Sequence, residues 1–113
     1  MPFINVKTNC KADTKQVEAI KSKLGLAITA VPGKSESWLM VEIEDDRKLY
    51  FQGSDAPAAM VQVSLYGDAS SNALTTLTSH ITGILLDVLQ IPSNRVYVSY
   101  QCTENWGWNG SNF

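Results

Sequence analysis

Apolar residues recur at every second position near the start of the chain. In residues 2–7, Ile4 and Val6 alternate with Asn5 and Lys7, which is the period of a strand with one buried face. Similar strand patterns follow at residues 38–44, 58–66 and 95–101, with a short candidate at 49–51. The sequence therefore predicts four main strands.

Between these strands, apolar residues recur at the spacing of an amphipathic helix. The two series are Val17, Ile20, Leu24, Ile28 and Val31, and Leu74, Leu77, Ile81, Leu85 and Val88. Asp13 followed by Gln16 is a capping-box pattern and predicts the start of the first helix. Pro32-Gly33 ends that helix, and Ser70-Ser71 precedes the second one as helix-cap residues.

The elements occur in the order strand–helix–strand, twice. A βαβ unit normally makes two parallel strands joined by a right-handed crossover. Two such units side by side predict an α/β (α+β) fold, with one four-stranded sheet and both helices on one face. We interpret the chain as a single domain over residues 1–113, with a pseudo-repeat over 1–57 and 58–113.

The second face of such a sheet needs a cover if it is apolar. We expect it to carry apolar groups, either Val96, Val98 and Tyr100 or the alternate set from the same strand. Self-association is the simplest way to cover them, which favours an oligomer.

Composition and charge exclude several classes of function. Hydrophobic residues make up 44% of the chain and charged residues 18%, as in an ordinary soluble globular protein. The net charge is -2 and there is no basic run, so neither nucleic acid nor a membrane surface is an expected partner. The start of the chain lacks the features of a secretory signal peptide. We expect a cytoplasmic protein, with export without a signal peptide as the alternative.

The cysteines and the single histidine form no recognisable metal or redox site. Cys10 and Cys102 make no CxxC pair and have no nearby histidine, so we expect two reduced thiols and no metal. His80 has no acid or nucleophile placed with it by spacing. We therefore expect it on the second helix, at the boundary beside the apolar face, and not in catalysis.

Pro2 is the first residue that indicates chemistry. Removal of Met1 would leave a secondary amine at the start of the chain. An α-amino group titrates near ~8, well below lysine, and burial or a nearby cation lowers its pKa further. Such an amine is suited to general-base catalysis at neutral pH. Taken alone, however, a proline at this position is more often structural or incidental.

Five segments together resemble the macrophage migration inhibitory factor family, within the tautomerase superfamily. They are MPFINVKTN, Gly33-Lys34, the segment ending Ser64-Leu65-Tyr66-Gly67, IPSNRVYVSY and the tail GWNGSNF. Their order and spacing follow the family over the whole chain. The resemblance implies a homotrimeric isomerase, a keto–enol tautomerase that acts on phenylpyruvate-like α-keto acids and dopachrome-like compounds without a cofactor.

The resemblance also implies roles for individual residues. Pro2 is the catalytic base, and Lys34 binds the substrate carboxylate and helps to keep the proline unprotonated. A neighbouring subunit contributes Tyr97 to the pocket. The other implied substrate-binding residues are Tyr66, Ser99, Trp106, Trp108 and Phe113. Independently of the resemblance, Tyr97 and Ser99 lie two apart on one predicted strand and so point the same way.

Three departures from the family pattern affect this site. Ser99 stands where the well-known members have asparagine, which shortens a hydrogen-bonding side chain. Trp106 and Tyr66 are bulkier than their counterparts and are expected to narrow or reshape the mouth of the pocket. The family's dithiol motif falls at Ala58 and Val61, so we expect no thiol–disulfide activity.

Other interpretations stay open. Lys34 is also explained as a solvated surface lysine, and Tyr97, Trp108 and Phe113 as core or interface aromatics. At the level of function, the alternative is a secreted cytokine-like ligand of a receptor protein, with vestigial catalysis. A third hypothesis is a structural trimer without catalysis, which holds if Met1 is retained and blocks Pro2.

Overall fold

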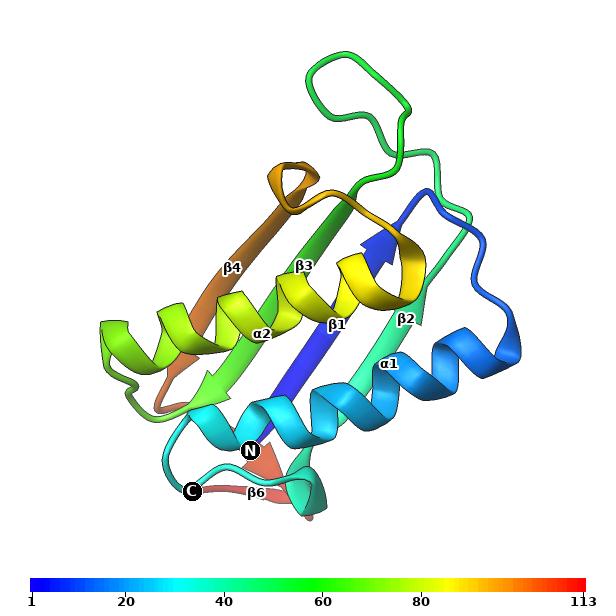
Figure 1. Ribbon diagram of the computed structural model, residues 1–113. Helices are drawn as coiled ribbons and strands as arrows, with labels where there is room; N and C mark the ends of the chain where they lie inside the picture. The colour runs from blue at the N-terminus through cyan, green and yellow to red at the C-terminus, as the bar shows by residue number, and fades with distance from the viewer.

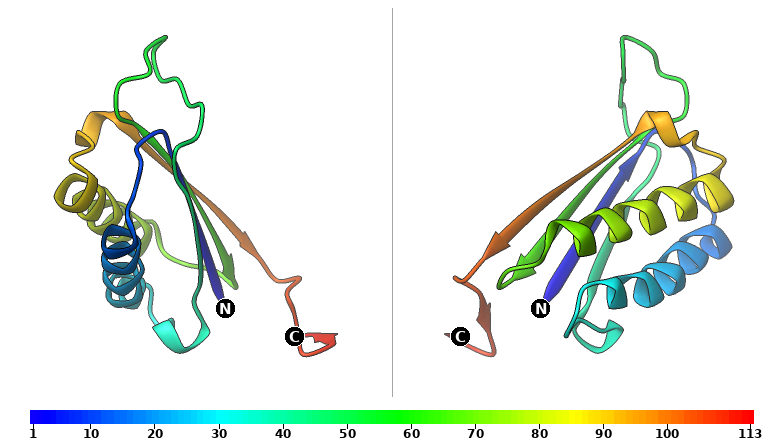
Figure 2. Two further views of the ribbon diagram at one scale, coloured as in Figure 1. Left: turned by 90° about the vertical axis from the view of Figure 1, so that its right-hand side faces the viewer. Right: turned by 60° about the vertical axis from the view of Figure 1, so that its left-hand side comes forward.

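The computed structural model describes all 113 residues and shows a four-stranded sheet with two helices on one face (Figures 1 and 2). The main elements are β1 (Pro2–Thr8), α1 (Thr14–Ala27), β2 (Met40–Glu44), β3 (Ala59–Tyr66), α2 (Ser71–Leu89) and β4 (Val96–Thr103). The spatial order is β2-β1-β3-β4, with β1 parallel to β2, antiparallel to β3, and β3 parallel to β4. Two βαβ units thus meet along an antiparallel centre, which confirms the predicted fold class.

Short elements complete the chain and correct the predicted strands in two places. They are the 3-10 turns η1 (Ile28–Ala30), η2 (Glu36–Trp38) and η3 (Ser93–Arg95), and a C-terminal hairpin of β5 (Gly107–Trp108) and β6 (Ser111–Asn112). The strand predicted at 38–44 begins only at Met40, because η2 occupies the preceding residues. The short strand predicted at 49–51 is wrong, since Phe51 bridges to Ser54 across a tight turn.

Both helices begin where the sequence predicts. Asp13 accepts a hydrogen bond from the Gln16 backbone N–H at 2.8 Å, and its own N–H donates to the Gln16 side chain at 2.9 Å. This confirms the capping box. Ser70 caps α2 by accepting from the Ala73 N–H at 3.1 Å. Neither helix has the length and apolar composition that a membrane crossing requires.

The hydrophobic core lies between the sheet and the helices. Side chains at most 1% exposed come from both layers: Ile4, Val6, Val61, Val63 and Leu65 from the strands, and Ile20, Leu24, Leu77, Ile81 and Leu85 from the helices. Full burial of one such side chain contributes about 1.5–3 kcal/mol. This packing fixes the sheet, and the sheet in turn fixes the ends of its strands.

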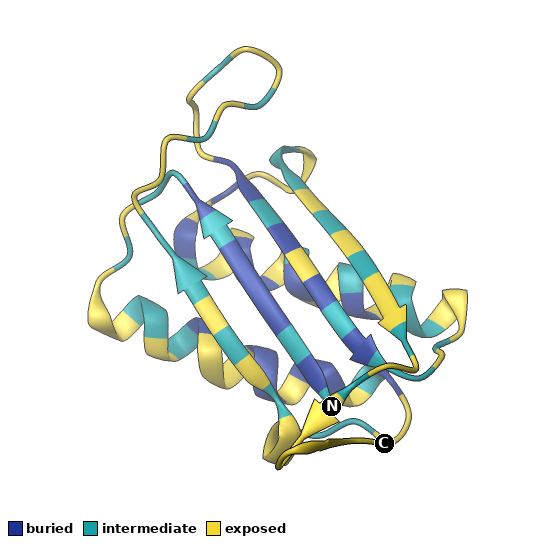
Figure 3. Cartoon of the chain, turned by 180° about the vertical axis from the view of Figure 1, so that it is seen from behind, coloured by how far each residue is buried: buried dark blue, intermediate teal, exposed yellow.

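The face of the sheet without helices is open (Figure 3), and polar groups line most of its centre. Val96, Val98 and Tyr100 pack at the margin of the core on the helix side. The alternate positions face outward. The hollow on the open face is lined by polar groups that include Asn5, Lys7, Glu42, Glu44, Gln62 and Ser99. The same face also carries the exposed side chains of Met40 and Tyr97 toward the ends of the strands, so the apolar groups predicted for this face come from the alternate set of β4.

Candidate active site

The start of β1 is held at one end of the two central strands. Pro2 is buried and lies opposite Leu65 of β3. The Tyr66 N–H donates to the Met1 carbonyl oxygen at 3.0 Å. The ladder of hydrogen bonds thus reaches the first peptide of the chain, and it fixes Pro2 relative to the end of β3.

Lys34 brings a positive charge to the same end of the sheet. It follows Gly33, whose φ of +81° turns the chain after η1, and its N–H donates to the Val31 carbonyl at 3.1 Å. Its Nζ donates to the Tyr66 carbonyl oxygen at 2.7 Å and lies 5.9 Å from the centre of the Tyr66 ring. Lys34 is half-buried and fixed in place, unlike an ordinary surface lysine.

The terminal amine is biased toward its neutral form. Burial lowers the pKa of the Met1 α-amino group, and the nearby Lys34 ammonium lowers this pKa further. Both effects disfavour a positive charge on the amine. An amine at this end of the sheet is therefore well placed to accept a proton near neutral pH.

Four aromatic rings, here called the aromatic wall, gather at this end of the sheet: Trp38, Tyr66, Trp108 and Phe113. The ring centres of Tyr66 and Phe113 are 5.1 Å apart, and Trp108 stacks on Phe113 at 6.4 Å. Trp38 meets Trp108 edge-on at 5.2 Å. Exposed aromatic surface near an ammonium group suits a flat, apolar molecule that carries an anionic group.

The C-terminal hairpin supports two of these rings. Its turn is Asn109-Gly110, with φ of +53° and +88°, the conformation that Asn-Gly favours in a two-residue hairpin turn. The Phe113 N–H donates to the Trp106 carbonyl at 3.1 Å, so the half-buried Trp106 closes the base of the hairpin. The structure thus brings five of the predicted residues to one end of the sheet: Pro2, Lys34, Tyr66, Trp108 and Phe113. Trp106 adjoins them.

Tyr97 and Ser99 are not part of this cluster within one chain. Because β4 runs antiparallel to β1, Tyr97 near its start lies at the end of the sheet opposite Pro2 (Figure 1). Ser99 lies midway along β4, on the polar open face. Tyr97 is 61% exposed, and its ring centre is 4.7 Å from that of Phe51. Tyr97 can reach a Pro2 site only in another copy of the chain.

The sequence pattern predicts Trp38 in a strand and gives it no role in the site. Instead it is half exposed in η2 and extends the aromatic wall. The available signal is that Trp38 directly follows four polar residues, Lys34 to Ser37, and belongs to no alternating apolar pattern. That signal is weak, and only the fold of the loop after α1 joins Trp38 to Trp108.

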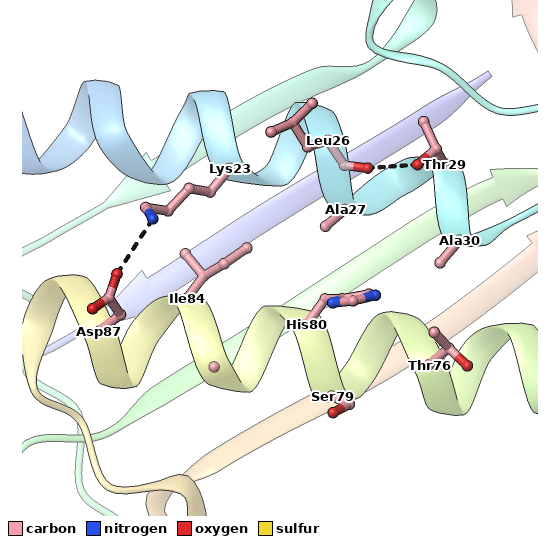
Figure 4. A pocket seen from close by; sticks show the side chains of 11 residues that line it. Lys23, Leu26, Ala27, Thr29, Ala30, Thr76, Ser79, His80, Ile84 and Asp87 are labelled. Atoms are coloured by element: carbon pink, nitrogen blue, oxygen red, sulfur yellow. Dashed lines mark hydrogen bonds and ion pairs between the residues drawn. The ribbon is translucent and has the colours of Figure 1, made fainter.

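A hollow outside this site lies between α1 and α2 (Figure 4). Its volume of about 620 Å³ is enough for a small ligand. Lys23 and Asp87 form an ion pair at 3.3 Å at one end, and His80 lines it without a hydrogen bond to a carboxylate or hydroxyl. His80 is exposed on α2. No cluster of three His, Cys, Asp or Glu side chains is present for a metal.

Comparison with known proteins gives matches over the whole chain. The family model described as macrophage migration inhibitory factor (MIF) matches residues 1–113. The macrophage migration inhibitory factor homolog of Trichuris trichiura is 32% identical, over 100% of both chains. Among solved structures, Leishmania major MIF2 superposes with a TM-score of 0.93 at 32% identity, over 100% of this chain and 97% of that one. The macrophage migration inhibitory factor from Trichinella spiralis gives a TM-score of 0.82 at 26% identity, over 98% and 99%.

Proposed function

Because the chain belongs to the macrophage migration inhibitory factor family, within the tautomerase superfamily, we propose that it is a keto–enol tautomerase for aromatic α-keto acids. Phenylpyruvate is the type substrate, and dopachrome-like compounds are a second class. The observation that carries the proposal is the Lys34 ammonium, fixed 2.7 Å from the Tyr66 carbonyl beside the start of β1. The reaction needs a cation for the carboxylate, rings for the aryl group and an amine for the proton.

In the proposed reaction, Pro2 is the base after Met1 is removed. While Met1 is present, the Pro2 nitrogen is a tertiary amide without a basic lone pair. As a free secondary amine it takes a proton from the carbon beside the keto group. The electrons of that C–H bond form a C=C bond, and the carbonyl becomes an enolate. The protonated amine then gives the proton to the enolate oxygen, so no cofactor or second reactant is consumed.

The other site residues bind the substrate in this proposal. Lys34 pairs with the carboxylate and, by its charge, favours the neutral amine. The aryl ring lies against Tyr66, Trp108 and Phe113, with Trp106 at the base of the hairpin. A neighbouring subunit supplies Tyr97 and Ser99 to complete the site.

The proposed active form is a homotrimer. Within one chain Tyr97 lies at the end of the sheet opposite Pro2, so a shared site needs a contact between copies. Three copies arranged head to tail close this contact into a ring, in which each chain gives Tyr97 to the next.

The second candidate is a cytokine-like ligand of a receptor protein. Membership of the family favours it, because relatives across the family carry the name macrophage migration inhibitory factor. Such a ligand would be made in the cytoplasm and exported without a signal peptide, and its tautomerase activity would be vestigial. A Pro2→Gly variant separates the two functions, because a receptor ligand keeps its effect on cells when the base is lost.

A phenylpyruvate tautomerase assay tests the proposed enzyme. The samples are processed protein, Met1-retaining protein and Pro2→Gly, with intact mass to identify the first residue and circular dichroism as the fold control. General acid–base catalysis contributes about 10²–10⁴-fold. We expect a loss in that range for Pro2→Gly and at least as large a loss with Met1 retained. Full activity of the Met1-retaining form would refute Pro2 as the base.

A further inference from the structure

The Arg95 guanidinium donates hydrogen bonds to backbone carbonyls and forms no ion pair with a carboxylate. The two ion pairs of the chain, Lys23–Asp87 and Arg47–Glu44, do not involve it. Its guanidinium donates to four carbonyl oxygens of one loop: Pro57 at 2.9 Å, Ala56 at 3.0 Å, and Phe51 and Ser54 at 3.1 Å each. The five N–H donors of arginine form a rigid fork, which is suited to holding a defined backbone shape.

The loop that Arg95 holds contains an unfavourable turn. Phe51 and Ser54 exchange backbone hydrogen bonds of 2.9 and 3.0 Å across Gln52 and Gly53. These two residues have φ of +54° and +75°, and a positive φ is unfavourable for a residue with a side chain such as Gln52. Arg95 binds the carbonyls at both ends of this turn, so it supports the conformation from outside.

This turn also determines where the Phe51 ring lies beside Tyr97. The Arg95 guanidinium lies 5.2 Å from the centre of the Phe51 ring, on its face. The Phe51 ring lies 4.7 Å from the Tyr97 ring, at an interplanar angle of 59°. Tyr97 is otherwise 61% exposed, and Phe51 is the only aromatic ring that it contacts. The orientation of the Tyr97 side chain therefore depends on where the loop places Phe51.

Asn9 secures the opposite side of the same loop. Its Nδ2 donates to the carbonyls of Leu49, Asp55 and Ala56 at 2.9–3.1 Å, and its Oδ1 accepts from the Ala58 N–H at 2.9 Å. These bonds tie the loop to the end of β1. They do not reach Phe51, so Asn9 holds the loop in place and Arg95 sets the position of the aromatic ring.

From this series of contacts we infer that Arg95 is a positioning residue, which acts through Phe51 to orient Tyr97 for the site of the neighbouring subunit. The inference rests on the proposed function, in which Tyr97 is shared between chains. Arg95 touches no substrate itself. It orders the exposed Tyr97 ring before substrate binds, so that less conformational freedom is lost on binding.

A double-mutant cycle tests this inference on the processed protein. Arg95→Gln should raise the KM for phenylpyruvate about tenfold while kcat stays within about twofold, because substrate binding is weakened and the base is untouched. In a Tyr97→Ala background, Arg95→Gln should change the KM by less than about twofold, since the effects of substitutions at residues that act as one unit are not additive. Phe51→Leu should reproduce the loss with Arg95 in place. Equal effects of Arg95→Gln in both backgrounds would overturn the inference.

Two further variants distinguish a specific effect of Arg95 from a general loss of folding. Arg47→Gln is the matched control, because Arg47 pairs with Glu44 at 3.3 Å and has no side-chain bond to the loop; its KM should not change. Arg95→Lys keeps the charge but loses the planar fork, and it serves if Arg95→Gln does not fold or assemble, as judged by circular dichroism and sedimentation. We expect Arg95→Lys to raise KM by less than Arg95→Gln.

A direct measurement of the ring separates this inference from the proposed function. In protein labelled with 3-fluorotyrosine, the ¹⁹F resonance of position 97 is identified by its loss in Tyr97→Phe. Arg95→Gln should move it toward the shift of the free amino acid, and Arg47→Gln should not. An inactive wild type would refute the tautomerase proposal while this readout still tests the inference. A resonance unmoved by Arg95→Gln would overturn the inference even in an active enzyme.

Discussion

Replacement of Lys34 by methionine removes the charge from the candidate site and keeps the apolar stem of the side chain. In the structure the Lys34 ammonium donates to the Tyr66 carbonyl at 2.7 Å, and its charge lowers the pKa of the terminal amine. The substitution therefore removes the cation proposed to bind the substrate carboxylate. It also removes an electrostatic effect on the proposed base.

The size of the first effect follows from the energy of one charged hydrogen bond. A hydrogen bond to a charged group contributes about 1.5–3 kcal/mol, and each 1.36 kcal/mol corresponds to about tenfold in rate. We therefore expect kcat/KM for phenylpyruvate to fall by about 10- to 150-fold. The Tyr66 carbonyl also loses its partner, but Tyr66 is only half-buried, so water replaces the bond and the fold remains.

The second effect has a definite sign. The base accepts a proton only when it is neutral, so activity rises with pH through the pKa of the amine. The Lys34 charge lowers the pKa of the Met1 α-amino group, and we expect the same direction for the Pro2 amine at the start of β1. Without the charge the pKa is higher, and the rising limb of the profile of kcat/KM against pH moves to higher pH.

Initial rates of phenylpyruvate tautomerisation across pH measure both effects on processed protein. Lys34→Arg keeps the charge and should lose less activity than Lys34→Met. Lys15→Met removes an exposed lysine near the start of α1 and should change nothing. The methyl ester of phenylpyruvate has no carboxylate, so its turnover should be less sensitive to Lys34→Met. Equal losses for acid and ester, with an unmoved pH profile, would show that Lys34 has neither role.

Sedimentation equilibrium at micromolar concentration should give the mass of three chains, because one chain cannot bring Tyr97 to Pro2; a clean monomer would refute the shared site. Replacement of both Cys10 and Cys102 by serine should leave phenylpyruvate turnover close to wild type, since neither cysteine is among the predicted site residues and no dithiol motif is present. A loss of more than about tenfold in folded protein, about 1.4 kcal/mol of barrier, would contradict this. Leu77→Ala should lower the free energy of unfolding in urea by about 2–5 kcal/mol, because Leu77 is 0% exposed; a change within error would mean that the core collapses around the gap.

The strands and helices are predictable because each has its own local signal. The alternation of Ile4 and Val6 depends on neighbouring residues only, and so does the capping box of Asp13 and Gln16. The order strand–helix–strand, which occurs twice, then predicts two βαβ units on one sheet. The resemblance to the family supplies the trimer, which no local pattern contains.

The sequence left open which face of β4 is buried, because alternation defines two sets of residues without saying which set the helices cover. On β4, Val98 and Tyr100 form one set, and Tyr97 and Ser99 form the other. Both sets contain large side chains, and only the position of the helices decides between them. The helices cover the first set, so the polar set faces outward.

The candidate site was predictable only in part, because its residues are far apart in the chain. Pro2, Lys34 and Tyr66 meet through the pairing of β1 with β3 and through the loop after α1. No spacing in the sequence indicates that meeting, and the resemblance alone pointed to it. Trp38 was missed because its role depends on a contact with the distant C-terminal hairpin.

The pairing of β1 with β3 also constrains how the chain folds. Pro2 lies opposite Leu65 and Thr8 opposite Ala59, so the two central strands are separated by more than about fifty residues, and such distant pairing makes folding slow. During synthesis β1 leaves the ribosome first but has no central partner until residues 59–66 follow. Ile4 and Val6 stay incompletely covered for that time. A chain truncated before β3 is therefore expected to remain without a stable sheet, so the molecule becomes stable only as its second half is completed.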